Sequence, residues 1–61
     1  MKTYVVYDRY LFGRQIHYME LLSVDVLLKL DRWRATKVRV YNSEEEAETD
    51  LKERRSWKYG N

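Results

Sequence analysis

The residues best suited to binding chemistry form a short row of two cations and one aromatic, Lys37, Arg39 and Tyr41. On a β-strand alternate side chains share one face, so this spacing places all three on the same side of a strand. Lys and Arg contact phosphates and an aromatic ring stacks on bases, so the row suits a nucleic-acid strand. The same residue types also keep an exposed strand soluble without binding anything. These three are therefore the candidate binding residues.

Catalytic and metal-binding chemistry has little support in the sequence. His17 is the single histidine, and the absence of cysteine excludes a thiol nucleophile and a cysteine-based zinc site. Glu20 follows His17 by three residues, a spacing that brings two ligands together on a helix but separates them on a strand. No glycine-rich phosphate-binding motif occurs. We therefore predict that the protein is not an enzyme, has no catalytic residues and uses no cofactor or metal.

The length of 61 residues predicts one small domain spanning residues 1–61. Apolar residues make up 44% of the chain and aromatic residues 15%, which is enough to build a folded core. The longest apolar run is Tyr4–Tyr7, far shorter than the ~20 residues of a membrane span or the ~7–15 of a signal peptide. We expect a soluble domain in the cytoplasm with no membrane partner.

Charge is distributed unevenly along the chain, although the net charge is only +2. Residues 1–43 carry a net charge of +4, residues 44–53 carry −5 and residues 54–61 carry +3. An acidic start and a basic end match the dipole of an α-helix, so the pattern predicts a terminal helix with a solvated outer side. The acidic stretch also weakens the attraction of the chain for nucleic acid.

The first half of the chain is predicted to form a β-hairpin. The run Thr3–Tyr7 has apolar side chains on both faces, which is typical of a central strand. Gly13 can supply the positive φ of a type II turn, after which Gln15–Leu21 returns as a second strand. The alternative for residues 9–22 is a helix, which Gly13 disfavours by about 1 kcal/mol.

The second half is predicted to form a helix, a strand and a helix. Ser23 can cap a helix that ends near Ala35. Thr36–Asn42 alternates as a half-buried strand, with Thr36 and Val38 on one face. Ser43 then begins the last helix with the S-x-x-E capping box.

The last helix has a small apolar side, chiefly Ala47 and Leu51. We assign its Asp50–Arg54 pair, spaced i, i+4, to the exposed side. The missing apolar contact is expected from aromatic residues that fold back from the end of the chain, Trp57 and Tyr59.

These elements predict an α+β fold with the order ββαβα, in which two helices cover one face of a three-stranded, mainly antiparallel sheet. Strand order 2-1-3 is favoured because it puts the doubly apolar first strand in the centre. One sheet face is then bare and rich in tyrosine, and exposed aromatic patches mark interaction surfaces. We therefore expect a small protein-interaction module that self-associates, as a homodimer, or binds another protein. The alternative is a weak nucleic-acid-binding domain that uses Lys37, Arg39 and Tyr41.

Overall fold

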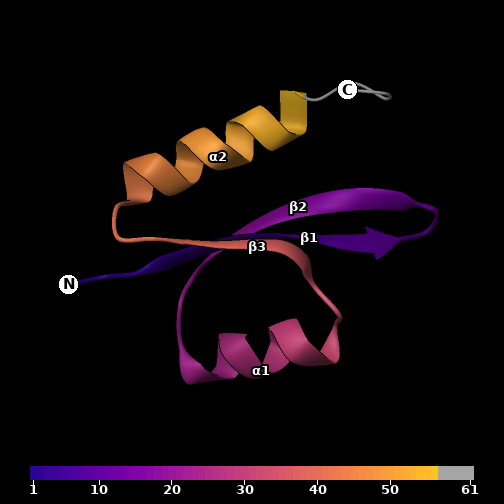
Figure 1. The fold of residues 1–61 in the computed structure, drawn as a ribbon, viewed down its shortest axis with the longest axis horizontal. Helices are drawn as coiled ribbons and strands as arrows, with labels where there is room; N and C mark the ends of the chain where they lie inside the picture. Colours follow the sequence, from indigo (N-terminus) through magenta and orange to yellow (C-terminus); the bar gives the residue numbers. More distant parts are fainter. Residues whose placement is uncertain (57–61) are drawn as a thin grey trace.

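The computed structural model describes residues 1–56 and contains one three-stranded sheet and two helices (Figure 1). The strand order is β2-β1-β3 and both neighbouring pairs are antiparallel, which confirms the α+β fold and the predicted topology. Within residues 1–56, neither helix has the length and apolar character needed to cross a membrane. Trp57 and Tyr59, expected to fold back, lie outside the described residues. The elements are β1 Tyr4–Leu11, β2 Arg14–Leu21, α1 Val24–Arg32, β3 Thr36–Tyr41 and α2 Glu44–Ser56.

The hairpin of β1 and β2 is confirmed, but its turn differs from the predicted type II turn. Phe12 has a φ of +53° and Gly13 a φ of +79°, whereas a type II turn needs a positive φ only at the second central residue. Two-residue loops with positive φ at both positions match the right-handed twist of the strands. Gly13 adopts this conformation without cost, but a bulky residue such as Phe12 is strained there.

Helix α1 begins where the sequence indicated and ends earlier. The Oγ of Ser23 accepts a hydrogen bond of 3.2 Å from the N–H of Val26, so the predicted cap is confirmed. The helix ends at Arg32 rather than near Ala35. Arg34 has a φ of +55°, and a left-handed residue just after the last turn stops an α-helix.

The two helices lie on opposite faces of the sheet, which corrects the expectation that both cover one face (Figure 1). Val5 and Tyr7 of β1 pack against the apolar side of α1. The next residue of β1, Asp8, points to the other face and contacts Arg54 of α2. Because β1 buries side chains on both of its faces, each face needs a covering layer.

The predicted bare, tyrosine-rich face is therefore absent. Tyr7 is buried and stacks on Tyr18 with ring centroids 5.3 Å apart. Tyr4 and Tyr41, on the face covered by α2, are partly buried. Of the tyrosines in residues 1–56, Tyr10 near the hairpin tip is the exposed one. Residues 1–56 therefore present no tyrosine platform on either face of the sheet.

Strand β3 contains a β-bulge at Lys37, which the sequence pattern did not indicate. The register between β1 and β3 shifts between Val6 and Asp8, and Lys37 has a φ of +51°. An extra residue in one strand reverses the alternation beyond it. Thr36 therefore shares the face of Asp8 rather than that of Val38, and its hydroxyl lies 3.5 Å from the Asp8 carbonyl oxygen.

The strain at the hairpin turn gives a testable prediction. Phe12→Asn places an Asn-Gly pair, the residues preferred in this turn type, where φ is positive at both positions. The left-handed conformation costs most residues ~1–2 kcal/mol, so we expect the free energy of unfolding to rise by about 1 kcal/mol and Tm by roughly 4–8 °C. Thermal unfolding followed by circular dichroism measures this.

The matched control is Phe12→Ala, which removes the ring but keeps a Cβ at the strained position. We expect little change in Tm for this variant. A lower Tm for Phe12→Asn would contradict the prediction.

Candidate functional site

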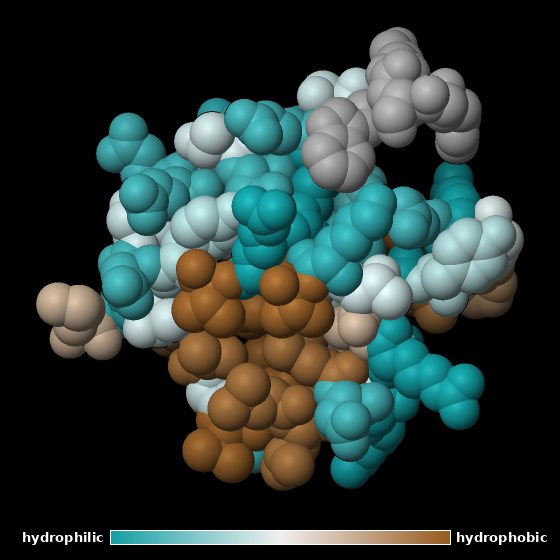
Figure 2. All heavy atoms as spheres, viewed as in Figure 1, coloured by the Kyte–Doolittle hydropathy of each residue, from teal (hydrophilic) through white to brown (hydrophobic). Residues whose placement is uncertain are grey.

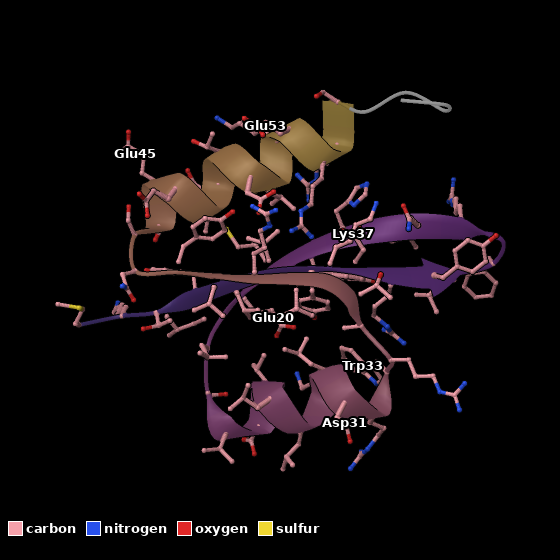
Figure 3. The ribbon with its side chains drawn as sticks, in the orientation of Figure 1. Glu20, Asp31, Trp33, Lys37, Glu45 and Glu53 are labelled. Atoms are coloured by element: carbon pink, nitrogen blue, oxygen red, sulfur yellow. The ribbon has the colours of Figure 1, made fainter. Side chains whose placement is uncertain are left out.

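The three candidate binding residues line one groove between β3 and α2. Together with Val38 they form its β3 wall. Figure 3 shows Lys37 on the side of the sheet that faces α2, the helix that carries Glu45 and Glu53. The structure thus brings the three residues together, although on a covered face rather than a bare one. The acidic side chains of the opposite wall are Glu45, Glu46, Asp50 and Glu53.

The groove has mixed charge. Its four carboxylates face three cations, Lys37, Arg39 and Arg54. The Tyr41 hydroxyl donates a hydrogen bond of 2.6 Å to Oδ2 of Asp50, which raises the pKa of Tyr41 above its ordinary value, while Arg39 nearby opposes the shift. A polyanion gains affinity from uncompensated cations, so this groove is poorly suited to a phosphate backbone.

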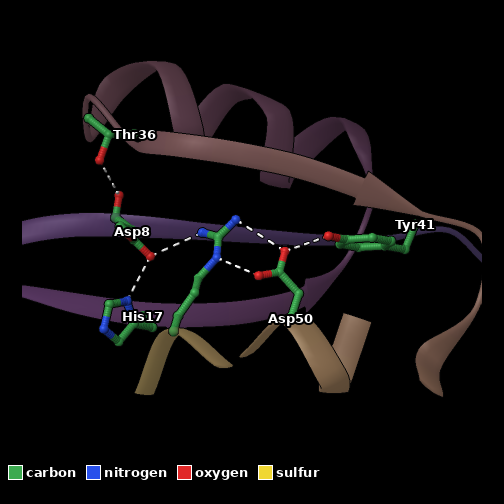
Figure 4. A network of polar contacts seen from close by, with 6 residues as sticks. Asp8, His17, Thr36, Tyr41 and Asp50 are labelled. Atoms are coloured by element: carbon green, nitrogen blue, oxygen red, sulfur yellow. Dashed lines mark hydrogen bonds and ion pairs between the residues drawn. The ribbon is translucent and has the colours of Figure 1, made fainter. Parts of the chain in front are cut away.

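Arg54, one of the cations that line the groove, forms a buried ion pair with Asp8 of β1 (Figure 4). The side chain of Asp8 is fully buried in β1, and that of Arg54 is 3% exposed. Arg54 Nη1 donates to Oδ1 of Asp8 at 3.1 Å, and Nδ1 of His17 lies 2.8 Å from the same oxygen. The other oxygen, Oδ2, makes no hydrogen bond within residues 1–56. The buried charge of Asp8 is therefore compensated through one oxygen.

The guanidinium of Arg54 also binds Asp50, one helical turn away. Its Nε lies 2.8 Å from Oδ1 and its Nη2 3.2 Å from Oδ2 of Asp50, which is a bidentate contact. Burial raises the pKa of the Asp50 carboxyl, but hydrogen bonds from Arg54 and Tyr41 outweigh this and hold the pKa below its usual range. Burial lowers the pKa of Arg54, and the two carboxylates reverse that effect.

The contact of His17 with Asp8 has the form used by enzymes to orient a histidine base. However, His17 is not among the residues that line the groove. Among the described residues, no group of three or more potential ligands lies close enough to hold a metal ion. The arrangement is best explained as a structural network that holds α2 on the sheet. Arg54 and Asp50 of α2 bind Asp8 of β1 and Tyr41 of β3, and Asp8 in turn contacts His17 of β2.

The sequence interpretation missed this network and placed the Asp50–Arg54 pair on the exposed side of α2. The pair instead faces the sheet, where Arg54 is buried together with Ala47. The signal was present, because Ala47, Asp50, Leu51 and Arg54 follow the spacing of one helix face. A charge directly after the apolar run of the central strand, Asp8, also required a partner.

No family model, curated protein or solved structure matches the chain.

Removal of the buried cation gives a second prediction. Arg54→Met leaves the charge of Asp8 buried without its ion pair, a change that costs ~3–5 kcal/mol. The whole stability of a chain of this size is roughly 3–9 kcal/mol. We therefore expect Arg54→Met to lose most of its helical circular dichroism at 25 °C.

Two further variants separate this explanation from simple loss of packing. The double variant Asp8→Asn/Arg54→Met removes the buried charge as well and should recover part of the lost stability. Arg55→Met, at the exposed neighbouring position, should change the free energy of unfolding by less than about 0.5 kcal/mol. Equal losses in the Arg54 and Arg55 variants would contradict the assignment.

The lowered pKa of Asp50 predicts a pH dependence. A carboxyl whose pKa is lower in the folded state binds fewer protons there, so it stabilises the fold above its ordinary pKa of 3.8 and this stabilisation is lost as pH falls below that value. We expect Asp50→Asn to lower the free energy of unfolding by about 1–3 kcal/mol at pH 6, where charged hydrogen bonds are lost. The difference from the native chain should shrink as pH falls from 4 to 2.

Urea unfolding at each pH measures this difference. A difference that stays constant down to pH 2 would show that the ionised form of Asp50 is not what stabilises the fold.

Proposed function

We propose that the protein is a small non-enzymatic interaction module that associates with a second copy of itself. The contact surface is an aliphatic surface on α1 and β3, which replaces the aromatic face expected from the sequence. Figure 2 shows apolar side chains gathered over α1 and the neighbouring side of β3. The residues of this aliphatic surface are Val24, Leu27, Leu28, Val38 and Val40, which are between 44% and 72% exposed.

The distribution of aliphatic side chains is the observation that carries this proposal. Within residues 1–56, the buried Val and Leu residues are Val5, Val6, Val26 and Leu30. Five Val and Leu side chains therefore lie on the aliphatic surface, against four that are buried. Single exposed apolar residues are ordinary, but a contiguous patch of them marks an interaction surface.

The energy of burial is comparable to the cost of association of two copies. Full burial of a Val or Leu side chain contributes ~1.5–3 kcal/mol, and these five are about half-exposed. Covering the aliphatic surface on both copies would contribute roughly 7–15 kcal/mol, against an association cost of ~4–15 kcal/mol. The two ranges overlap, so at most a weak dimer is expected; a net gain of about 6 kcal/mol, which lies inside their spread, corresponds to a Kd of about 10–100 µM. A small domain with little core also gains stability from such a contact.

The alternative, nucleic-acid binding through Lys37, Arg39 and Tyr41, has less support. The Tyr41 hydroxyl is bonded to Asp50, and four carboxylates share the groove with the cations. Those carboxylates reduce the local attraction for phosphates. Fluorescence anisotropy with single-stranded and duplex probes at low salt tests this alternative.

Self-association is tested by one added charge on the aliphatic surface. Leu28 is 59% exposed, so Leu28→Glu should not disturb the fold but should oppose its burial against a second copy. We expect the native chain to show a concentration-dependent shift toward dimer in sedimentation velocity between ~1 and ~200 µM. The Leu28→Glu variant should remain monomeric, with at least a tenfold weaker association.

Gln15→Glu is the matched control, because it adds the same charge at an exposed position of β2. It should associate like the native chain. A native chain that stays monomeric at ~200 µM, or a Leu28→Glu variant that associates normally, would overturn the proposed function.

A further inference from the structure

We infer that the two copies associate face to face about a two-fold axis, with α1 of each copy lying over β3 of the other. The two α1 helices then form one shared layer between the two sheets. This inference rests on the proposed function and specifies how its contact is made.

Helix α1 carries aliphatic residues on two opposite sides, and Asp31 also lies on the side away from the sheet (Figure 3). Val26 and Leu30 are buried against the helix's own sheet. Leu28 is two residues from each of them, which on a helix of 3.6 residues per turn puts it on the far side. Val24 lies one turn before Leu28 on that far side and is 72% exposed. A helix with apolar residues on both sides is typical of one that lies between two layers.

The sheet has a complementary apolar strip that its own α1 leaves uncovered. The core cluster under α1 includes Val5, Tyr7 and Tyr18 from β1 and β2, but neither valine of β3. A helix with side chains is ~10–12 Å wide and strands are ~4.8 Å apart, so one helix covers about two strands. A second helix is therefore required to cover Val38 and Val40. The far side of α1 of the other copy, with Val24 and Leu28, supplies aliphatic side chains for this contact.

The orientation of α1 places an apolar residue where two neighbouring helices would meet. Lys29 lies 3.7 Å from the carboxylate of Glu20 on β2, so that side of α1 faces β2. Leu27, on the opposite flank of the helix by the 3.6-residue period, faces β3. It is 53% exposed. In the inferred dimer, Leu27 of each copy would lie between the two α1 helices.

The other two-fold arrangement joins the free edges of β3 into one continuous sheet, and two observations disfavour it. The bulge at Lys37, with its φ of +51°, disrupts that edge, and bulges and lysines are devices that block edge pairing. Edge pairing would also leave Leu28 in water, because this residue points away from the sheet. The face-to-face arrangement covers every residue of the aliphatic surface.

Disulfide trapping distinguishes the two arrangements. In the face-to-face dimer the double variant Leu28→Cys/Val40→Cys brings a cysteine of α1 close to the cysteine on β3 of the other copy. The single variant Val40→Cys keeps its two thiols about 20 Å apart, in different sheets. The double variant Val38→Cys/Val40→Cys reports edge pairing, in which opposite Cα atoms lie ~4.5–5.5 Å apart, within disulfide range.

We expect a covalent dimer, seen by non-reducing electrophoresis after mild oxidation at ~100 µM, for Leu28→Cys/Val40→Cys alone. Circular dichroism checks that each variant is folded. A covalent dimer of Val40→Cys or Val38→Cys/Val40→Cys would overturn the face-to-face arrangement. So would absence of the expected crosslink while the variants sediment as dimers, and in both cases the proposed function stands. Monomeric native chain in sedimentation would overturn both.

Discussion

The buried ion pair between Asp8 and Arg54 determines how the layers of this protein are arranged. Helix α2 has little apolar surface of its own, so burial of hydrocarbon alone does not hold it on the sheet. A carboxylate in the central strand cannot remain buried without a counter-charge, and Arg54 supplies it from α2. This contact commits α2 to one face of β1. Helix α1 is then the only helix of residues 1–56 on the other face, where it covers two strands of three. The uncovered valines of β3 follow from that division.

Much of the fold could be predicted from the sequence because it depends on local chemistry. The alternation of β-branched and apolar residues indicated the strands, and Ser23 indicated the start of α1, where its Oγ meets the N–H of Val26. Gly13 correctly indicated a hairpin turn. The doubly apolar character of β1 led to the correct strand order. Each of these features needs information from only a few neighbouring residues or from one face of one element.

The remaining features depend on contacts between residues far apart in the sequence, about which the periodicity of one helix or strand gives no information. Asp8 and Arg54 are 46 residues apart, and their pairing decides which face α2 covers. The i, i+4 spacing of an ion pair does not tell whether the pair is exposed or buried. The prediction that Asp50 and Arg54 lie on the exposed side of α2 was therefore wrong. The bulge at Lys37 has no glycine or asparagine to indicate it. Strand alternation indicated that Arg39 and Tyr41 share one face, whereas the bulge at Lys37 and the acidic wall opposite depend on how β3 pairs and where α2 packs.

The β-bulge at Lys37 limits how many copies of the chain could assemble through the edge of β3. A small chain with exposed aliphatic side chains and an unpaired sheet edge can add further strands at that edge and form cross-β fibres. In this protein the left-handed conformation of Lys37 disrupts the edge that a further strand would need, while the aliphatic surface lies on a broad side of the sheet. In the proposed dimer, a two-fold contact through that side would bury the aliphatic surfaces of both copies. No aliphatic surface would then be exposed for a third copy to bind. Growth would then stop at a closed pair instead of a filament.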